Sequence, residues 1–194
     1  MAGKNKLSIY ISFLLRHNPQ AVGLEMDRHG WVSTEALIAG INTERKYRIS
    51  MELLEQIVAE DAKGRYRFNE DKSRIKACQG HSIPWVEPEL EYKAPPQYLY
   101  HGTTTDSLQM IMNSGFILKM KRHAVHMQAQ EDKAWQSARR WKQATPVVLQ
   151  IDAEKMHRDG FVFGVSDNEV WCAEKVPVGY ICGMLYQPVD VAKK

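Results

Sequence analysis

Apolar residues near the start of the chain recur at helical spacing. The apolar positions of this run are Leu7, Ile11, Leu14 and Leu15. Pro19 ends the run, and Ser33 and Ser50 are good N-caps for helices around 35–38 and 51–60. The pattern therefore predicts three short helices.

A period of two replaces the helical period further on. Residues 65–68 and 74–77 alternate apolar and polar side chains and are separated by a polar turn at 69–73, which is typical of a β-hairpin. Three short helices followed by a hairpin favour a winged-helix-like lobe.

The second half of the chain is richer in strand patterns. The expected strands are 98–100, 124–126, 147–151, 161–163, 170–173 and 180–186. Helical patterns lie at about 104–113 and 131–142. The fold class that these patterns predict is α+β.

Prolines and glutamates mark a linker between the two halves. Pro84, Pro88, Pro95 and Pro96 alternate with acidic residues, a pattern that fits neither a regular helix nor a central strand. We expect a first lobe at 1–83, a linker at 84–96 and a second lobe at 97–194.

Composition excludes several classes of protein. The chain has 194 residues, 44% hydrophobic and 25% charged, which is typical of a globular protein with its own core. No stretch reaches the roughly 20 apolar residues of a membrane span, and the N-terminus lacks a signal-peptide pattern. We expect a cytoplasmic protein, and a monomer because no sustained heptad is present.

The three cysteines, Cys78, Cys172 and Cys182, lie far apart and form no C-x-x-C pair. We expect them to be buried small hydrophobic residues. P-loop, Rossmann and G-x-S-x-G motifs are absent, as are H-E-x-x-H and clustered carboxylates, so we expect no metal site. Any chemistry must depend on arginine, histidine and hydroxyl groups.

Three basic positions stand apart along the chain. Arg16 and His17 end the first helix, Arg65 begins the hairpin, and Arg122 lies in the basic run 119–123. Each feature alone has a structural explanation, such as complementing a helix dipole or lying on a solvated surface. Together, three arginines and a histidine without a metal-ligand cluster suit a phosphate dianion. With a net charge of only +3, nucleic-acid binding would rest on such local arginines.

A further motif lies where an apolar strand gives way to polar residues. His101, Gly102 and Thr103 follow 98–100, and a residue without Cβ at a strand end lets a ligand approach the backbone. A tight turn explains them equally well. The polar segment 79–82 reads as a turn.

These segments resemble, in order, the signatures of the NAD-dependent RNA 2'-phosphotransferases. The matching segments are Leu14-Leu15-Arg16-His17-Asn18-Pro19, Asp27-Arg28-His29-Gly30-Trp31-Val32, Lys63-Gly64-Arg65-Tyr66, Gln79-Gly80-His81-Ser82, Pro95 to Thr103, and Arg122-His123-Ala124-Val125-His126. They extend over most of the chain, and six in order are specific.

The resemblance implies a winged-helix-like RNA lobe joined to a lobe of the ADP-ribosyltransferase fold. It also implies a reaction in which an internal RNA 2'-phosphate attacks the nicotinamide riboside of NAD and expels nicotinamide. The ribose 2''-hydroxyl then attacks the phosphodiester and leaves RNA with a 2'-hydroxyl and ADP-ribose 1'',2''-cyclic phosphate. The family's essential set corresponds here to Arg16, His17, Arg65 and Arg122.

By the same resemblance, NAD is the co-substrate, and His101, Gly102, Thr103, His126 and Val170 belong to its pocket. Two segments depart from the family pattern. Met127-Gln128 replace Leu-Ser, which removes one possible hydroxyl ligand, and Cys172 replaces a leucine. Glu169 precedes Val170, and if both lie on a strand we expect Glu169 to point away from the pocket.

Two other functions fit parts of the sequence. A non-catalytic winged-helix nucleic-acid binder with a degenerate ligand-sensing lobe would explain the basic hairpin but not Arg122 with residues 101–103. An ADP-ribosyltransferase that modifies protein or nucleic-acid ends would use NAD without removing phosphate.

Overall fold

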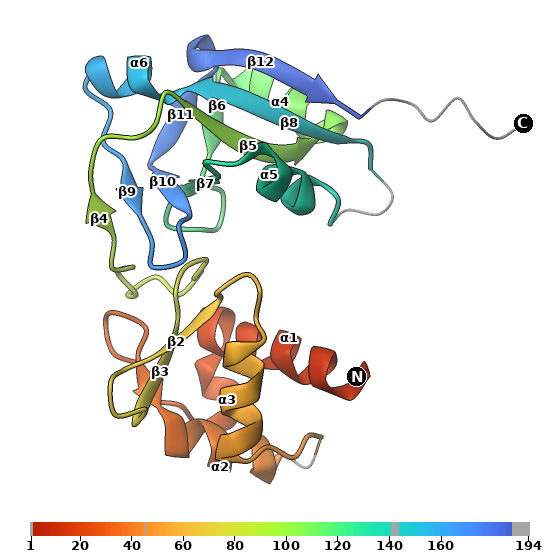
Figure 1. Ribbon diagram of the computed structural model, residues 1–194, viewed down its shortest axis with the longest axis vertical. Coiled ribbons are helices and arrows are strands. Elements are labelled where there is room, and N and C mark those ends of the chain that lie inside the picture. The colour runs from red at the N-terminus through yellow and green to blue at the C-terminus, as the bar shows by residue number, and fades with distance from the viewer. Residues whose placement is uncertain (1, 45, 141–143, 188–194) are drawn as a thin grey trace, which may run out of the picture. The chain divides into compact units, whose positions relative to one another are not determined.

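The structure is a computed structural model that describes residues 2–44, 46–140 and 144–187 (Figure 1). It contains α-helices and several small antiparallel sheets, so the predicted α+β class is confirmed. The chain divides into two compact units. Unit 1 comprises Met1–Glu89, Lys121–His123 and Ser166–Asn168, and unit 2 comprises Leu90–Met120, Ala124–Val165 and Glu169–Lys194. Each unit thus contains segments from distant parts of the chain. The sequence suggested two continuous lobes, and their boundaries at 1–83 and 97–194 stay predictions.

Unit 1 combines helices with a small sheet. Its elements are α1 (Ala2–His17), the 3-10 turn η1 (Pro19–Val22), β1 (Val32–Ser33), α2 (Thr34–Thr43), α3 (Met51–Ala59), β2 (Tyr66–Phe68) and β3 (Arg74–Ala77). The strands form an antiparallel sheet in the order β1-β3-β2. Ser33 and Ser50 accept hydrogen bonds from Ala36 and Leu53 backbone N–H groups, so both predicted N-caps are confirmed.

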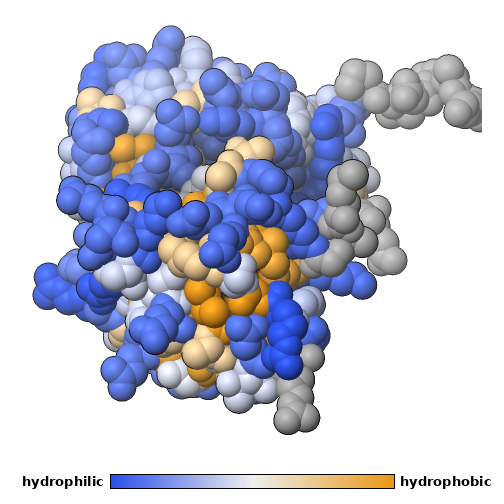
Figure 2. All heavy atoms as spheres, turned by 60° about the horizontal axis from the view of Figure 1, so that its bottom comes forward, coloured by the Kyte–Doolittle hydropathy of each residue, from blue (hydrophilic) through white to orange (hydrophobic). Residues whose placement is uncertain are grey.

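The core of unit 1 sets the orientation of α1. Leu7, Ile11, Leu14 and Leu15 are buried against the other two helices and the sheet. The opposite face of α1 still exposes Ile9 and the ring of Phe13. Figure 2 shows an apolar patch within a largely hydrophilic surface.

Unit 2 is built on three small sheets. Its strands are β4 (Glu91–Tyr92), β5 (Tyr98–Thr104), β6 (Phe116–Leu118), β7 (Val125–Met127), β8 (Pro146–Asp152), β9 (Gly164–Val165), β10 (Trp171–Ala173), β11 (Lys175–Pro177) and β12 (Ile181–Tyr186). Its helices are α4 (Thr105–Ser114), α5 (Glu131–Ala138), α6 (Ala153–Arg158) and the 3-10 turn η2 (Val178–Tyr180). The strand orders are β12-β8-β5, β4-β9-β10-β7 and β11-β6. The apolar run of β8 is central because Val147, Val148 and Leu149 are all buried, which requires cover on both faces.

Several local predictions for unit 2 are wrong. Phe161–Phe163 form no strand, and the paired residues are Gly164 and Val165. The predicted helix at 131–142 ends at Ala138 within the described residues, and residues 141 and 142 lie outside them. The sequence also gave no signal for β6, β11 or α6. None of the described helices is long and apolar enough to cross a bilayer.

The cysteine prediction is correct for two of three residues. Cys78 and Cys172 are buried free thiols, and burial raises the pKa of the Cys78 thiol to about 11. Cys182 is exposed, because it lies on β12 at the edge of its sheet.

Candidate functional site

Helix α1 ends in two basic residues, Arg16 and His17. Pro19 cannot continue the helix, and the Asn18 N–H donates to the Phe13 carbonyl, which closes the last turn. Because the apolar face of α1 is buried in the core, its angular position fixes where both basic side chains project.

The segment Gly80–Ile83 borders this helix end. The Ser82 N–H donates to the Arg16 carbonyl at 3.0 Å, and the Ser82 Oγ lies 2.9 Å from His17 Nδ1. Gly80 has φ 87°, and a Cβ at that position would lie 3.6 Å from Arg16 Cζ. The backbone of Gly80 therefore passes next to the guanidinium.

The Arg16 guanidinium is desolvated without being paired. Its Nε and Nη2 are buried and have no hydrogen-bond partner among the residues that the structure describes. The pKa of Arg16 is lowered to about 10, mainly by burial, with the positive charges of Arg65 and Arg122 acting in the same direction and Tyr66 opposing them. A buried cation without compensation costs free energy and is a place where an anion is favoured.

Arg65 begins the hairpin and is held quite differently. Its Nε and Nη2 donate to Asp61 Oδ1 at 2.9 and 2.7 Å, and its Nη2 also reaches the Ser8 hydroxyl at 3.3 Å. The side chain of Asp61 is only 3% exposed. Burial alone would lower the pKa of Arg65, but the hydrogen bond to Asp61 raises it overall.

Arg122 completes the basic group. The residue is exposed, and unit 1 includes its segment, Lys121–His123. Burial lowers the pKa of His17, and the charges of Arg16 and Arg122 lower it further. Unit 1 thus brings Arg16, His17, Arg65 and Arg122 within electrostatic range of one another.

His81 is a buried histidine that the sequence analysis read only as part of a turn. It is 1% exposed, and neither ring nitrogen has a partner among the described residues. Burial lowers its pKa to about 3, and the nearby charges of Arg16, His123, Lys76 and His17 act in the same direction. Gly30, with φ 81°, gives the ring its space, since a Cβ there would lie 2.8 Å from His81 Nε2.

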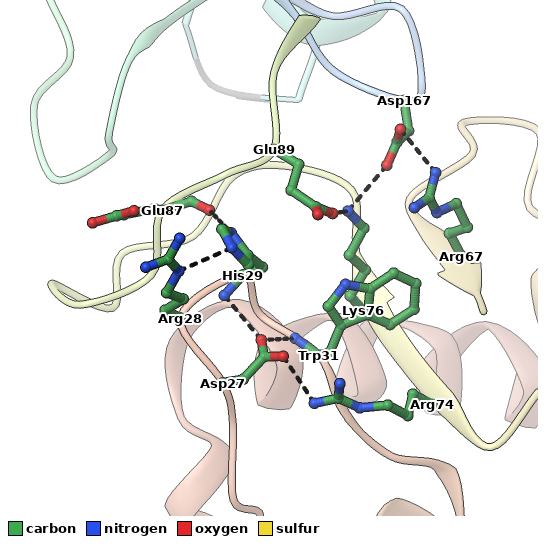
Figure 3. Close-up of polar contacts among 10 residues, drawn as sticks. All are labelled: Asp27, Arg28, His29, Trp31, Arg67, Arg74, Lys76, Glu87, Glu89 and Asp167. Carbon is green, nitrogen blue, oxygen red and sulfur yellow. Dashed lines mark hydrogen bonds and ion pairs between the residues drawn. The ribbon is translucent and has the colours of Figure 1, made fainter.

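Three other cations of unit 1, Arg67, Arg74 and Lys76, pair with carboxylates (Figure 3). Lys76, 2% exposed, pairs with Glu89 and with Asp167 at 3.1 Å. Its Nζ lies 4.9 Å from the centre of the Trp31 ring, and Arg67 Cζ lies 5.3 Å from the same ring. Arg67 also pairs with Asp167, so neither cation matches the unpaired state of the Arg16 Nε and Nη2 atoms.

The residues predicted for NAD belong to unit 2. His101, Gly102 and Thr103 lie within β5, which continues to Thr104, so the expected strand end is wrong. His101 Nδ1 donates to the His126 carbonyl of β7 at 2.9 Å, which places a proton on Nδ1 because a carbonyl only accepts. Thr103 is buried.

Gly102 has a packing role that the sequence reasoning missed. A Cβ on Gly102 would lie 2.1 Å from the Ala134 carbonyl oxygen of α5. The missing side chain therefore lets α5 pack against β5. On this side of Gly102 it is helix α5, rather than a ligand, that approaches the backbone closely.

Val170 and Glu169 do face different surroundings, but not for the predicted reason. Val170 is 5% exposed, whereas the Glu169 side chain is 80% exposed and pairs with Lys133 at 3.2 Å. Neither residue lies in a strand, and Glu169 has φ 61°, so the difference comes from a bend before β10.

The site residues include two that sequence reasoning passed over, Asp61 and Ser82. Asp61 is four positions from Arg65, a spacing that could have indicated an ion pair. The contact between Ser82 and His17 joins residues 65 positions apart, for which a single sequence has no signal. Among the described residues, no three side chains of the metal-ligating types are grouped.

Comparison with known proteins places this arrangement in context. The model of the family described as "RNA 2'-phosphotransferase, Tpt1 / KptA family" matches residues 3–175. A protein of Fusobacterium nucleatum named "Probable RNA 2'-phosphotransferase" is 42% identical over 176 residues, covering 91% of this chain and 96% of its own. A protein of the same name from Pseudomonas fluorescens is 41% identical over 174 residues, covering 90% and 93%.

Proposed function

Since the chain belongs to the RNA 2'-phosphotransferase, Tpt1 / KptA family, we propose that it removes an internal 2'-phosphate from RNA by transferring it to NAD. The products are RNA with a 2'-hydroxyl, nicotinamide and ADP-ribose 1'',2''-cyclic phosphate. The proposal assigns the RNA phosphate to residues of unit 1 and NAD to residues of unit 2.

The observation that carries the proposal is that two buried nitrogens of the Arg16 guanidinium have no hydrogen-bond partner in the part of the chain that the structure describes. A doubly charged phosphate would compensate this cation, and Arg65 and Arg122 lie within electrostatic range of it. The residues present therefore fit a phosphate ligand. Guanidinium groups keep their charge at any working pH, so this binding requires no metal ion.

The first chemical step is a displacement at C1'' of the nicotinamide riboside. A phosphate oxygen of the RNA forms the new bond to C1'', and the C1''–N bond to nicotinamide breaks. The task of the protein here is positioning, because the nucleophile must be held in line with the leaving group. Arg65, oriented by Asp61, and Arg16, held beside Gly80, supply fixed contacts for this purpose.

The second step transfers the phosphate away from the RNA. The ribose 2''-hydroxyl attacks phosphorus, the RNA 2'-oxygen leaves with a proton, and charge spreads over the phosphoryl oxygens. Preorganised arginines stabilise such charge. His17 is the member of the group that can move a proton near neutral pH, since its lowered pKa keeps the ring neutral there.

The finer fold assignments are part of the same proposal. Three helices with the sheet β1-β3-β2 support a winged-helix-like RNA lobe in unit 1. The small antiparallel sheets of unit 2 support an ADP-ribosyltransferase-like lobe. Within it, His101, Gly102, Thr103, His126 and Val170 are the proposed NAD contacts, with Gly102 packing against α5 on the side where a Cβ would lie.

A product analysis tests the proposed function. The purified protein is mixed, in EDTA, with a short RNA bearing one internal 2'-phosphate, with and without NAD, and both RNA and nucleotide products are followed by mass spectrometry. We expect loss of the phosphate together with ADP-ribose 1'',2''-cyclic phosphate only when NAD is present.

The other outcomes separate the alternative functions. Consumption of NAD with retention of the RNA phosphate would point to end modification by ADP-ribose. Unchanged RNA and unchanged NAD, from folded protein, would contradict the enzyme and favour a nucleic-acid-binding sensor.

A further inference from the structure

We propose that the segment Gly80–Ile83 is the positioning frame of the phosphate site and that Ser82 within it is a positioning residue for His17. The proposal deepens the proposed function, on which its kinetic part rests. It starts from the contact of Ser82 with His17 Nδ1 and from the other contacts that the same four residues make.

The segment contacts two separate pieces of the site. On the side of α1, the Ser82 N–H holds the Arg16 carbonyl and the Ser82 hydroxyl contacts His17. On the side of the basic run, the Ile83 carbonyl accepts from His123 Nε2 at 2.9 Å. His123 directly follows Arg122, so one short segment borders both the end of α1 and the segment that carries Arg122.

The segment Gly80–Ile83 is held in place by contacts of its other residues. His81 is buried with its ring against Gly30, and Gly80 passes beside the Arg16 guanidinium. The Ile83 carbonyl also accepts from the Val86 N–H at 3.1 Å. Ser82 therefore presents its hydroxyl from an anchored backbone rather than from a free loop.

The hydroxyl acts on His17 by occupying one ring nitrogen. Ser82 Oγ can donate to Nδ1 or accept from it, and in both cases Nε2 is the nitrogen left for the substrate. The Phe13 ring also lies beside the imidazole, with centroids 6.2 Å apart. Without the hydroxyl, Nδ1 would lose this partner and the ring would sample more than one orientation.

The test begins with a measurement that requires no turnover. Nitrogen-15 NMR of the His17 imidazole, assigned with His17→Asn and recorded at a pH where the ring is neutral, reports whether each ring nitrogen is hydrogen-bonded. In the unchanged protein we expect the Nδ1 signal of a nitrogen with a protein hydrogen-bond partner. Ser82→Ala should move that signal towards the value of a solvent-exposed imidazole, and Ser82→Thr, which keeps the hydroxyl, should restore it.

The second measurement is steady-state kinetics with 2'-phosphorylated RNA and NAD. We expect Ser82→Ala to lower kcat by up to about tenfold, the rate equivalent of one hydrogen bond, with both KM values nearly unchanged. Ser82→Thr should recover most of the rate. When His17 is already alanine, adding Ser82→Ala should have no further effect, because the hydroxyl acts only through the imidazole.

Ser73→Ala is the matched control. Ser73 lies in the hairpin turn of the same unit, and its hydroxyl accepts from Asn69 Nδ2 at 3.1 Å. Removing it deletes a similar hydrogen bond away from the segment and should change neither the His17 Nδ1 signal nor kcat.

Two outcomes would overturn the proposal. One is an unchanged His17 Nδ1 signal in Ser82→Ala, and the other is an equal loss of rate from Ser82→Ala with and without His17. If the unchanged protein removes no phosphate, the proposed function fails, while the NMR result still decides whether Ser82 orients His17.

Discussion

Two arginines of unit 1 occupy contrasting environments, one at the end of α1 and one at the start of β2. Arg65 has a nearly buried carboxylate partner in Asp61, which accepts from two of its nitrogens. Arg16 has two buried nitrogens without a partner among the described residues. Their side chains are chemically identical, so the difference lies in what surrounds them.

The contrast separates a residue that supports the fold from one kept ready for a ligand. Removing either partner of a satisfied ion pair such as Arg65–Asp61 lowers the free energy of unfolding of the protein. An unsatisfied buried cation reduces stability and persists where function requires it. Arg65 can serve both purposes, whereas the free edge of Arg16 has no evident structural use.

Replacing Arg16 should have the largest effect on activity. In Arg16→Met we expect turnover of 2'-phosphorylated RNA to fall by about 100-fold or more, which corresponds to roughly 3 kcal/mol of transition-state stabilisation. The free energy of unfolding should stay within about 1 kcal/mol of its original value or rise, because a desolvated charge is removed. Single-turnover assays and urea unfolding measure the two quantities. If Arg16→Met lowered the free energy of unfolding as much as Arg65→Met does, the two arginines would not differ in their structural role.

Replacing Arg65 should have the largest effect on stability. Arg65→Met leaves the Asp61 carboxylate buried and unpaired, and we expect the free energy of unfolding to fall by about 3 kcal/mol. Adding Asp61→Asn to that variant should recover part of the loss, since the uncompensated charge is gone. Urea unfolding of the single and double variants checks this, and additive losses would show that the pair is not a structural unit.

The neutral state of His81 predicts a pH dependence of stability. Its pKa is lowered from 6.5 to about 3, so below pH 6.5 the unfolded chain binds a proton at this site that the folded protein does not. The free energy of unfolding should therefore fall as pH falls from about 6.5 towards 3, by on the order of 1 kcal/mol per pH unit from this group. In His81→Gln the decline between pH 6.5 and 4.5 should be shallower. Parallel curves for the two proteins would contradict the assignment.

A smaller effect on stability is expected at Gly30, whose backbone lies against the His81 ring. Gly30→Ala adds strain at φ 81° and a Cβ 2.8 Å from His81 Nε2, and we expect a loss of about 2 kcal/mol. Gly23→Ala is the control, because Gly23 has φ 66° but nothing within 4 Å of an added Cβ. The difference between the two variants in thermal or urea unfolding isolates the contact with His81. Equal losses would mean that backbone strain accounts for the whole effect.

Local features of the fold could be predicted, because they depend on residues close in sequence. The caps at Ser33 and Ser50 and the hairpin β2–β3 follow from short patterns. Strands of only two or three residues, such as β9, contain too few alternating positions to be located from the sequence. The strand expected at 170–173 begins one residue later, at Trp171, because it follows a bend at Glu169, which has φ 61°.

The candidate site could be predicted only in part. The basic residues stand out by type, and their order along the chain carries the family resemblance. The hydrogen-bond partners of these residues cannot be predicted in the same way, because contacts such as that of Ser82 with His17 join residues 65 positions apart. Gly102 shows the same limit, because its small size is explained by α5, a helix more than 25 residues away.

The most direct test of the central claim measures whether a 2'-phosphate compensates Arg16. A short RNA with one internal 2'-phosphate, and the same RNA without it, are added to the unchanged protein and to Arg16→Met, and the rise in Tm is recorded for each. We predict that the phosphate gives the unchanged protein an additional rise in Tm that Arg16→Met loses. An equal additional rise in both proteins would contradict the claim that the unpartnered edge of Arg16 is kept for the substrate phosphate.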